Sequence, residues 1–510
     1  MSSPLPEVNG NGTLIPDHDK LNSLSGHLGH LDDTQQASLG KFKEKLQAEK
    51  LWTPAPGGAD PKQASHDDGT LLRFLRARKF SVDDAMVQFR DTEEWRERNN
   101  MKRLYECIDI EDYEETRRLY PQWTGRRDKR GVPVYVFRVA DLDARTMAAY
   151  ERSSVSTSVG GDEVIGTHES VDSTPATTSG SDLSATSATG TGGSKIKKEK
   201  EKKHSRDPSS GGSGFLRGSW FLGGGGQAKE GTVSPASKHG ETPAKMLRLF
   251  ALYENLTRFV MPLCSIAPDR ANPQTPITQS NNIVDITGVG LRQFWNLRSH
   301  MQDASQLATA HYPETLDRIF VIGAPSFFPT VWSWIKKWFD PITVSKVFIL
   351  PGEKAEVYAI LSKYIDDENI PTQYGGKMHF QFGDMPSLDK ELSSIVQWGE
   401  GAAVRVHQAD TAEHKTNGDA TAAFYAHQEE KTLPHGPIFW ERSTTGPGSV
   451  SNGAASGEQQ AQHLWRAIGV GSVGGTARRT VVATLAAPGL DQDGAEQWVS
   501  QAQLGSAVFA

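Results

Sequence analysis

The stretch that decides the fold is residues 311–350, which read HYPETLDRIFVIGAPSFFPTVWSWIKKWFDPITVSKVFIL. Two short apolar, β-branched runs within it, residues 318–323 and 346–350, have the length of buried strands. The segment between them, residues 325–340, is too long for a turn and repeats its apolar residues with the period of a helix. A strand, a crossover helix and a second strand predict a parallel βαβ unit.

Large apolar residues cover one broad side of the predicted crossover helix. On a helical wheel they span an arc of roughly 160°. Thr330, Ser333, Lys336 and Lys337 fall on the other side. The apolar arc consists of Phe327, Phe328, Val331, Trp332, Trp334, Ile335, Trp338 and Phe339.

The simplest interpretation of this arc is a helix that packs on its sheet. Ordinary packing seldom needs so many rings, however, and tryptophans above lysines suit the boundary between lipid and water. We therefore hypothesise that the helix is a movable lid over an apolar cavity. Trp332 and Trp334 stand about 160° apart on the wheel. This predicts Trp332 on the outer side of the closed lid and Trp338 on the inner side.

The composition argues against several classes of protein. The 510 residues carry a net charge of −7 without a dominant basic stripe, so we expect no nucleic-acid partner. Cys107 and Cys264 lie far apart without metal-ligand spacing, which indicates a reducing compartment and two packed thiols. The first residues lack the regions of a secretion signal, and no apolar run is long enough to span a bilayer. Any membrane contact is expected to be peripheral.

The folded part of the chain is expected to have two domains. Residues 1–30 are polar and predicted to be disordered, and residues 31–118 form a helical N-terminal domain. Residues 119–388 form an α/β domain. A Ser-, Thr- and Gly-rich insertion interrupts it at about residues 153–241, where the composition cannot bury enough surface to offset ordering.

The remaining residues, 389–510, read as a low-complexity C-terminal tail. Residues 433–440 and 480–485 are its strand-like fragments. The sequence leaves open whether these fragments add edge strands to the fold or stand apart from it.

Signatures of enzymes are missing from the sequence. Gly288-Val289-Gly290 follows a predicted strand, but Gln293 stands where the dinucleotide fingerprint needs a third glycine. P-loop, zinc-protease and nucleophile-elbow motifs are absent as well. We therefore expect a protein that is not an enzyme and uses neither a cofactor nor a metal.

A scattered set of polar residues points instead to ligand binding. Arg78 and Lys79 end one predicted helix, and Glu314 precedes a predicted strand. Thr343 and Lys346 follow the turn after the crossover helix. Singly, each is typical of a solvated surface. Together they offer what an inositol phosphate needs, because cations pair with phosphate while a carboxylate and a hydroxyl bind ring hydroxyls.

Several segments around these residues carry a family resemblance. They are LLRFLRARKF (71–80), YPQWTGRRDKRGVPVY (120–135), HYPETLDRIFVIGAP (311–325), FDPITVSKVFIL (339–350) and ENIPTQYGGK (368–377). The chain, from about residue 34 to 377 without the insertion, resembles the CRAL-TRIO lipid-binding proteins and most of all the fungal phosphatidylinositol/phosphatidylcholine transfer type. The resemblance implies an N-terminal helical domain packed on an α/β domain. In that domain a mixed, largely parallel sheet forms the floor of an apolar lipid cavity, and the helix of residues 327–340 gates it.

The resemblance also implies two headgroup sites. Phosphatidylinositol is held by the residues that match Arg78, Asp128, Glu314, Thr343 and Lys346, and the polar set described above adds Lys79 to this headgroup site.

The site for a second lipid, phosphatidylcholine, is altered in this chain. Tyr135, Tyr253 and Ser280 match the family, whereas Thr124 replaces a tyrosine and Asn282 replaces a threonine. The lost ring removes a cation–π partner for choline, worth roughly 0.5–2 kcal/mol. Phosphatidylinositol is therefore the better supported ligand. Near the gate hinge, Asp317 also replaces a glycine of the family.

The resemblance implies a soluble, monomeric transfer or presentation protein. It exchanges phosphatidylinositol with membranes through an aromatic gate helix and makes the lipid available to lipid kinases. It is expected in the cytoplasm, peripherally associated with internal membranes. Two alternatives stay open: a carrier of another apolar ligand such as a sterol, and a membrane-targeted regulatory scaffold.

Overall fold

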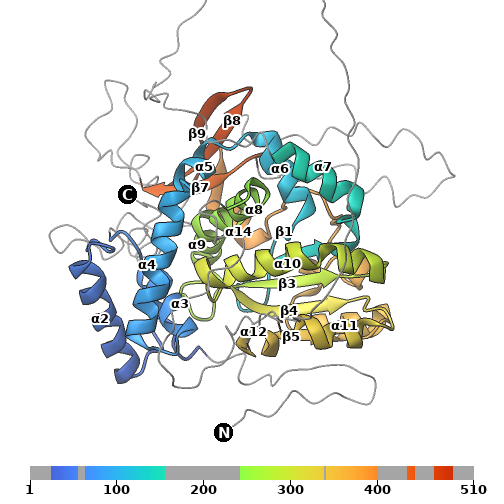
Figure 1. The fold of residues 1–510 in the computed structure, drawn as a ribbon, viewed down its shortest axis with the longest axis horizontal. Coiled ribbons are helices and arrows are strands. Elements are labelled where there is room, and N and C mark those ends of the chain that lie inside the picture. The colour runs from blue at the N-terminus through green and yellow to red at the C-terminus, as the bar shows by residue number, and fades with distance from the viewer. Residues whose placement is uncertain are drawn as a thin grey trace, which may run out of the picture. The chain divides into compact units, whose positions relative to one another are not determined.

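The computed structural model describes residues 24–54, 64–154, 242–337, 341–399, 434–442 and 465–485. Most of the predicted N-terminal segment, nearly all of the insertion, and the gate residues Trp338 and Phe339 lie outside these residues. The described residues hold a helical N-terminal region, a largely parallel sheet and a second, antiparallel sheet (Figure 1).

Helices form the N-terminal region because their apolar stripes pack on one another. The carboxylate of Asp32 accepts a hydrogen bond from the Gln35 N–H, and the Gln35 side chain accepts one from the Asp32 N–H, which makes a capping box at the first helix. Leu39, Phe42 and Phe89 are among the residues that fill the shared core. The helices are α2 (Asp33–Ala48), α3 (Asp68–Ala77), α4 (Val82–Arg98), α5 (Met101–Cys107) and α6 (Ile110–Leu119).

The main sheet has the strand order β1-β2-β3-β4-β5. Strand β1 is antiparallel to β2, and the other neighbours are parallel. Their bounds are β1 (Gln122–Arg127), β2 (Pro133–Arg138), β3 (Ser280–Asp285), β4 (Leu316–Ile322) and β5 (Val347–Ile349). The parallel pair of β4 and β5 is the βαβ unit that the sequence predicts, and the mixed, largely parallel sheet confirms the predicted fold class.

Helical segments connect and flank these strands. Before β3 they are η3 (Val139–Asp141), α7 (Ala144–Ser154), α8 (Ala244–Asn255), the π-helical η4 (Leu256–Val260) and α9 (Met261–Ser265). After β3 they are α10 (Leu291–His311), α11 (Phe328–Ile335), α12 (Pro341–Ser345), α13 (Lys354–Leu361), η5 (Asp367–Asn369), η6 (Thr372–Tyr374) and α14 (Lys390–Ile395).

The crossover between β4 and β5 differs from the single helix predicted for residues 325–340. It contains two helices, α11 and α12, and residues 338–340 lie outside the described part of the chain. Pro329 stands in the first turn of α11, where its missing backbone N–H costs nothing. The lid hypothesis therefore concerns the short helix α11.

Each face of the main sheet has its own apolar core, because side chains alternate along a strand. On one face Phe320 and Phe348, partners in the sheet register, pack with Val357 and Leu361 of α13. On the other face Val321 packs with residues of both α10 and α11. Helix α11 thus lies over the sheet face opposite α13.

The C-terminal strands form a second sheet of order β6-β9-β8-β7, in which every neighbouring pair is antiparallel. The two strand-like fragments of the tail fall in and around β7 and at the end of β9. Strand β8 was not predicted, since Gly469 and Gly471 weaken its strand pattern. The strands are β6 (Val396–Trp398), β7 (Ile438–Arg442), β8 (Trp465–Val473) and β9 (Thr476–Leu485).

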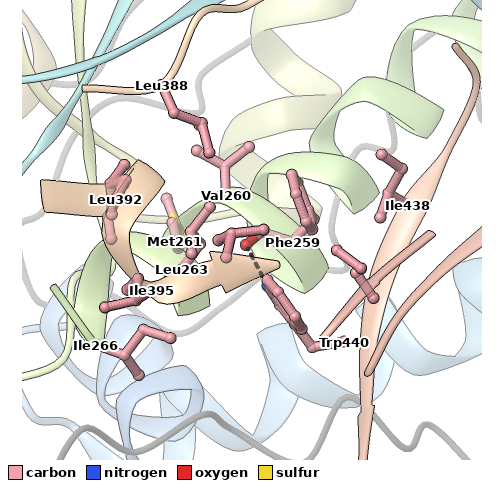
Figure 2. Packing of buried hydrophobic residues seen from close by; sticks show 14 of the residues in the cluster. Phe259, Val260, Met261, Leu263, Ile266, Leu388, Leu392, Ile395, Ile438 and Trp440 are labelled. Atoms are coloured by element: carbon pink, nitrogen blue, oxygen red, sulfur yellow. Dashed lines mark hydrogen bonds between the residues drawn. The ribbon is translucent and has the colours of Figure 1, made fainter. Parts of the chain in front are cut away.

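Trp440 ties this second sheet to the α/β domain. Its indole N–H donates a hydrogen bond to the Phe259 carbonyl at 3.1 Å, and the two rings stack with centroids 5.4 Å apart. Apolar side chains from η4, α9 and α14 surround the pair, as Figure 2 shows for Val260, Leu263 and Ile395. The second sheet therefore shares a hydrophobic core with the domain that carries the main sheet.

We predict that Trp440→Ala lowers the free energy of unfolding by about 3–5 kcal/mol, since it empties a fully buried aromatic site. Urea denaturation followed by circular dichroism measures this. The control is Val473→Ala, at a position 62% exposed in the β8–β9 hairpin, which should change stability by less than about 0.5 kcal/mol. Equal stability of Trp440→Ala and the wild type would show that the second sheet is dispensable.

A buried carboxylate also holds the segment that leads into β7. Glu114 of α6 accepts hydrogen bonds from the Gly436 N–H at 3.0 Å and from Arg117 Nε at 2.6 Å, and His435 Nδ1 lies 3.4 Å away. Burial alone would raise the pKa of Glu114. The hydrogen bonds from His435, Arg117 and Gly436 outweigh burial and lower the pKa to about 2.

Acid should therefore weaken this attachment. A carboxyl group with a depressed native pKa stabilises the fold above its unfolded pKa of 4.5, and this stability is lost as the pH falls from about 5 towards 2. We predict that Glu114→Gln is less stable than the wild type at pH 7, and that the difference shrinks by about 2–3 kcal/mol by pH 3. Urea midpoints across this range measure it. A difference independent of pH would contradict the role of Glu114.

Candidate functional site

A lysine and a glutamate meet where β4 and β5 begin. The Lys346 ammonium donates to the Glu314 carboxylate at 3.0 Å and to the Leu316 carbonyl at 2.7 Å. Glu314 has φ +56°, a left-handed conformation that is uncommon outside glycine. Lys346 is 8% exposed. The pair is a nearly buried polar site at one end of the main sheet.

Arg76 of α3 brings a second cation towards Glu314. Burial lowers the pKa of Arg76 to about 10, and the charge of Glu314 opposes this shift. The Arg76 guanidinium donates to the Thr278 hydroxyl at 3.3 Å and to the Gly26 carbonyl at 3.4 Å, and its Nε has no partner among the described residues. The sequence analysis missed Arg76. The available signal was a cation set among the apolar residues of a short helix.

The basic residues that the sequence analysis selected on this segment lie at the surface. Arg78 is the C-cap residue of α3, and Lys79 follows it with φ +50°. Both are exposed. Within the described residues, no hydrogen bond or ion pair joins either of them to Glu314 or Lys346.

Thr343 lies in α12 on the turn that leads into Lys346. Its carbonyl accepts a hydrogen bond from the Lys346 N–H at 3.1 Å, and its side chain is half-buried. Of the predicted headgroup residues, the structure joins the side chains of Glu314 and Lys346, while Thr343 contacts Lys346 through the backbone of the helical turn.

Asp128 belongs to a different polar cluster. It closes the β1–β2 turn by accepting hydrogen bonds at 2.8 Å from the N–H groups of Arg130 and Val132, and it accepts another at 2.8 Å from the Asn281 amide. Its carboxylate also pairs with the Arg130 guanidinium. Burial raises the pKa of Asp128. No hydrogen bond links it to Lys346 in the described part of the chain.

Asp317, which stands where the resemblance implies a hinge glycine, completes this cluster. Its carboxylate pairs with the Arg130 guanidinium and with Nη1 of Arg318 at 2.7 Å. The Arg318 side chain is fully buried, 4.7 Å from the centroid of the Tyr364 ring. Asp317 therefore acts as a counter-charge for two arginines.

The residues predicted for a second headgroup lie around β2 and β3. Tyr135 and Asn282 are neighbours across the two strands, and the Asn282 amide donates to the Ser280 hydroxyl at 3.2 Å. The Thr124 hydroxyl donates to a backbone carbonyl of β2 at 2.9 Å. Tyr253 packs against the apolar cluster that contains Tyr135.

A small cavity borders Tyr135. Its volume is about 50 Å³, and Tyr113, Trp123 and Asn255 also line it. This is room for a few water molecules. The segment that leads into β7 closes one side of the cavity with Gly436.

Helix α11 covers its face of the sheet with the residues predicted for the gate. Phe328, Val331 and Ile335 are buried in the cluster that includes Val321 of the sheet. Phe327 packs against the same cluster and is partly buried. The spacing of the buried positions is that of a helix packed along one stripe.

The structure places Trp332 differently from the outward position that the helical wheel predicts. Trp332 is half-buried and stacks on Phe328 with centroids 6.2 Å apart, whereas Trp334 is 39% exposed. The helical wheel treated residues 325–340 as one helix. It placed Trp332 and Trp334 at the two ends of the apolar arc. The buried stripe of the shorter helix passes through Val331 and Ile335 and leaves Trp334 outside. Trp338 and Phe339 lie outside the described residues.

Two further searches of the described residues bear on the site. No cluster of three or more His, Cys, Asp or Glu side chains in them could hold a metal ion. None of their helices is long and apolar enough to cross a membrane.

Comparison with known proteins gives a consistent picture. The family model for the CRAL/TRIO domain matches residues 226–376, and that for the CRAL/TRIO N-terminal domain matches residues 38–91. The SEC14 cytosolic factor of Kluyveromyces lactis is 24% identical over 360 residues, covering 70% of this chain and 82% of the relative. The Sec14 cytosolic factor of Schizosaccharomyces pombe is 24% identical over 405 residues, covering 78% and 96%.

A plant relative and a solved structure also match. The phosphatidylinositol/phosphatidylcholine transfer protein SFH7 of Arabidopsis thaliana is 26% identical over 347 residues, covering 66% of this chain and 43% of the relative. The crystal structure of Sfh5 has a TM-score of 0.36 at 12% identity, covering 69% of this chain and 89% of its own. The family matches and the relatives confirm the predicted resemblance and the expectation of a protein that is not an enzyme.

We predict that Asp317→Ala lowers the free energy of unfolding by about 3–5 kcal/mol, because it removes the carboxylate that faces two arginine side chains inside the domain. Urea denaturation measures the change. The control is Asp141→Ala, whose ion pair with Arg138 is exposed and should contribute less than about 1 kcal/mol. A gain in stability for Asp317→Ala would contradict this prediction. It would show that burying these charges costs more free energy than their ion pairs contribute.

Proposed function

The chain carries a CRAL/TRIO domain with its N-terminal companion and is a distant homologue of the Sec14-type lipid-binding proteins, and from this premise we propose that it binds phosphatidylinositol and exchanges it with membranes. The lipid is presented to lipid kinases, and the protein acts from the cytoplasm as a monomer in peripheral contact with internal membranes. The insertion at about residues 153–241 takes no part in holding the lipid.

The observation that carries this proposal is the nearly buried Lys346–Glu314 pair, and Arg76 adds a cation whose charge acts on Glu314. A phosphodiester group binds to cationic side chains that are held in place, and inositol hydroxyls donate hydrogen bonds to a carboxylate. An ammonium has three donors, of which Lys346 uses two on Glu314 and Leu316. The site thus offers a further donor and two cationic side chains to a phosphate, and one carboxylate to the ring.

A phospholipid needs such a carrier because of its chains. At about 0.8 kcal/mol per methylene, one sixteen-carbon chain exposed to water costs about 12 kcal/mol. The sheet face under α11 is already apolar, through residues such as Val321 and Val347. When α11 moves off this face, acyl chains can cover it in the place of Phe328 and Val331.

The start of the α11 segment has the backbone that a hinge needs. Gly323 directly follows β4 with φ +72°, and a Cβ at this position would lie 2.0 Å from the Thr287 hydroxyl oxygen. No other residue fits there without a rearrangement. We infer that α11 swings about Gly323, and that exchange occurs where a membrane supplies apolar surroundings for the exposed helix.

Phosphatidylinositol is favoured over phosphatidylcholine as the cargo. The altered position Thr124 offers no ring to a choline, and its hydroxyl already bonds to the backbone of β2. Tyr135, which would meet the second headgroup, is packed in an apolar cluster.

We predict that Lys346→Ala slows phosphatidylinositol transfer between vesicles by one to two orders of magnitude. A hydrogen bond from a charged group contributes about 1.5–3 kcal/mol. The matched control is Lys377→Ala, whose ion pair with Glu368 is exposed, and which should transfer at the wild-type rate. Melting temperatures of both variants check the fold. Equal loss of transfer for phosphatidylinositol and phosphatidylcholine in Lys346→Ala would contradict the headgroup assignment.

A further inference from the structure

Two tryptophans from separate helices form an exposed pair. Trp295 of α10 is 43% exposed and Trp334 of α11 is 39% exposed, and their ring centroids lie 5.4 Å apart. Leu291, 44% exposed, lies one helical turn before Trp295. Exposing two large indole rings to water costs free energy. Such an exposed apolar pair indicates a surface that binds a partner.

Cations accompany this pair on both helices. The Arg298 guanidinium lies 5.2 Å from the centroid of the Trp295 ring. Arg292 is exposed on the preceding turn of α10, and Lys336 and Lys337, two and three residues after Trp334, are exposed as well. Residues 286–302 and 323–337, which hold all of these side chains, contain neither aspartate nor glutamate.

We propose that Arg292, Trp295, Arg298, Trp334, Lys336 and Lys337 form a docking patch for an anionic lipid surface. Indole rings are stabilised at the level of the lipid headgroups, where the ring is buried and its N–H remains hydrated. Cations beside them are attracted by the negative potential of the membrane. The proposal deepens the proposed function by naming the surface that meets the membrane, and it rests on that function for the passage of lipid.

The charges favour a lipid surface over a protein partner. Lysine is depleted at protein interfaces, and the core of such an interface is poor in charge. Here cations flank both indoles with no acidic residue in either segment. An anionic membrane matches this arrangement, because its headgroups neutralise the cations while its interior accepts the rings.

The two halves of the patch have different attachments. The opposite side of α10 is buried through Phe294 and Leu297, so Trp295 stands on a helix that is fixed to the sheet. Trp334 stands on α11, the helix proposed to move. Docking through Trp295 would therefore hold the protein on the membrane while α11 exchanges its contact with Trp295 for contact with lipid.

The test uses the full chain loaded with phosphatidylinositol and measures equilibrium binding by vesicle flotation. Vesicles contain phosphatidylcholine alone or with phosphatidylserine. Trp295→Ala should weaken binding to the mixed vesicles about tenfold, through lost burial of one ring. Arg292→Glu with Arg298→Glu should weaken it by at least about fivefold for each cation, and on the anionic vesicles only.

Matched controls lie on other surfaces of the described chain. Val473→Ala and Lys41→Glu change exposed positions of the β8–β9 hairpin and of α2, and both should bind vesicles as the wild type does. Native mass spectrometry should find the same bound lipid in Trp295→Ala as in the wild type.

Each other outcome has a distinct meaning. Wild-type vesicle binding by Trp295→Ala and by the double Arg variant overturns the docking patch. Concentration-dependent dimers of the wild type that Trp295→Ala dissociates, without vesicle binding, also overturn it in favour of contact between copies. A wild-type protein that binds vesicles through the patch but never retains phosphatidylinositol overturns the proposed function and leaves the docking patch in place.

Discussion

Both faces of the main sheet are apolar, and each has to be covered by other parts of the chain, because parallel strands are stable only when they are buried on both sides. On one face α13 covers the sheet with Val357 and Leu361. On the other face the cover is shared by α10 and the short helix α11. We propose that acyl chains replace the part of this cover that the short helix α11 provides. The lipid-binding function that we propose depends on this exchange.

Charged residues near the main sheet serve two different purposes. Asp128, Arg130, Asp317 and Arg318 pair mutually and fix the β1–β2 turn against β4. The pair of Lys346 and Glu314 is different, since one ammonium donor has no partner among the described residues and the charge of Arg76 also acts on Glu314. The first group of charges holds parts of the fold together, whereas a site with a spare donor can bind a ligand.

The C-terminal sheet adds its own apolar side chains to the core of the α/β domain. Trp440 fills a buried position against Phe259, and Glu114 fixes the segment before β7 through Gly436. This sheet also closes the small cavity beside Tyr135. The end of the domain where a second headgroup was expected is therefore covered by a part of the chain beyond residues 226–376, the range of the CRAL/TRIO match.

The sequence by itself determined the elements whose signal is local: the β4 and β5 strands, a helical crossover between them, the family motifs, and Glu314 and Lys346 as headgroup candidates. Tertiary structure decided what depends on distant neighbours. Which of Trp332 and Trp334 faces water follows from where α11 ends and from the contact of Trp334 with Trp295. The burial of Arg76 and of Asp128 depends on residues far along the chain. Strand β8 forms despite its glycines because β7 and β9 pair with it on both sides, which no local pattern records.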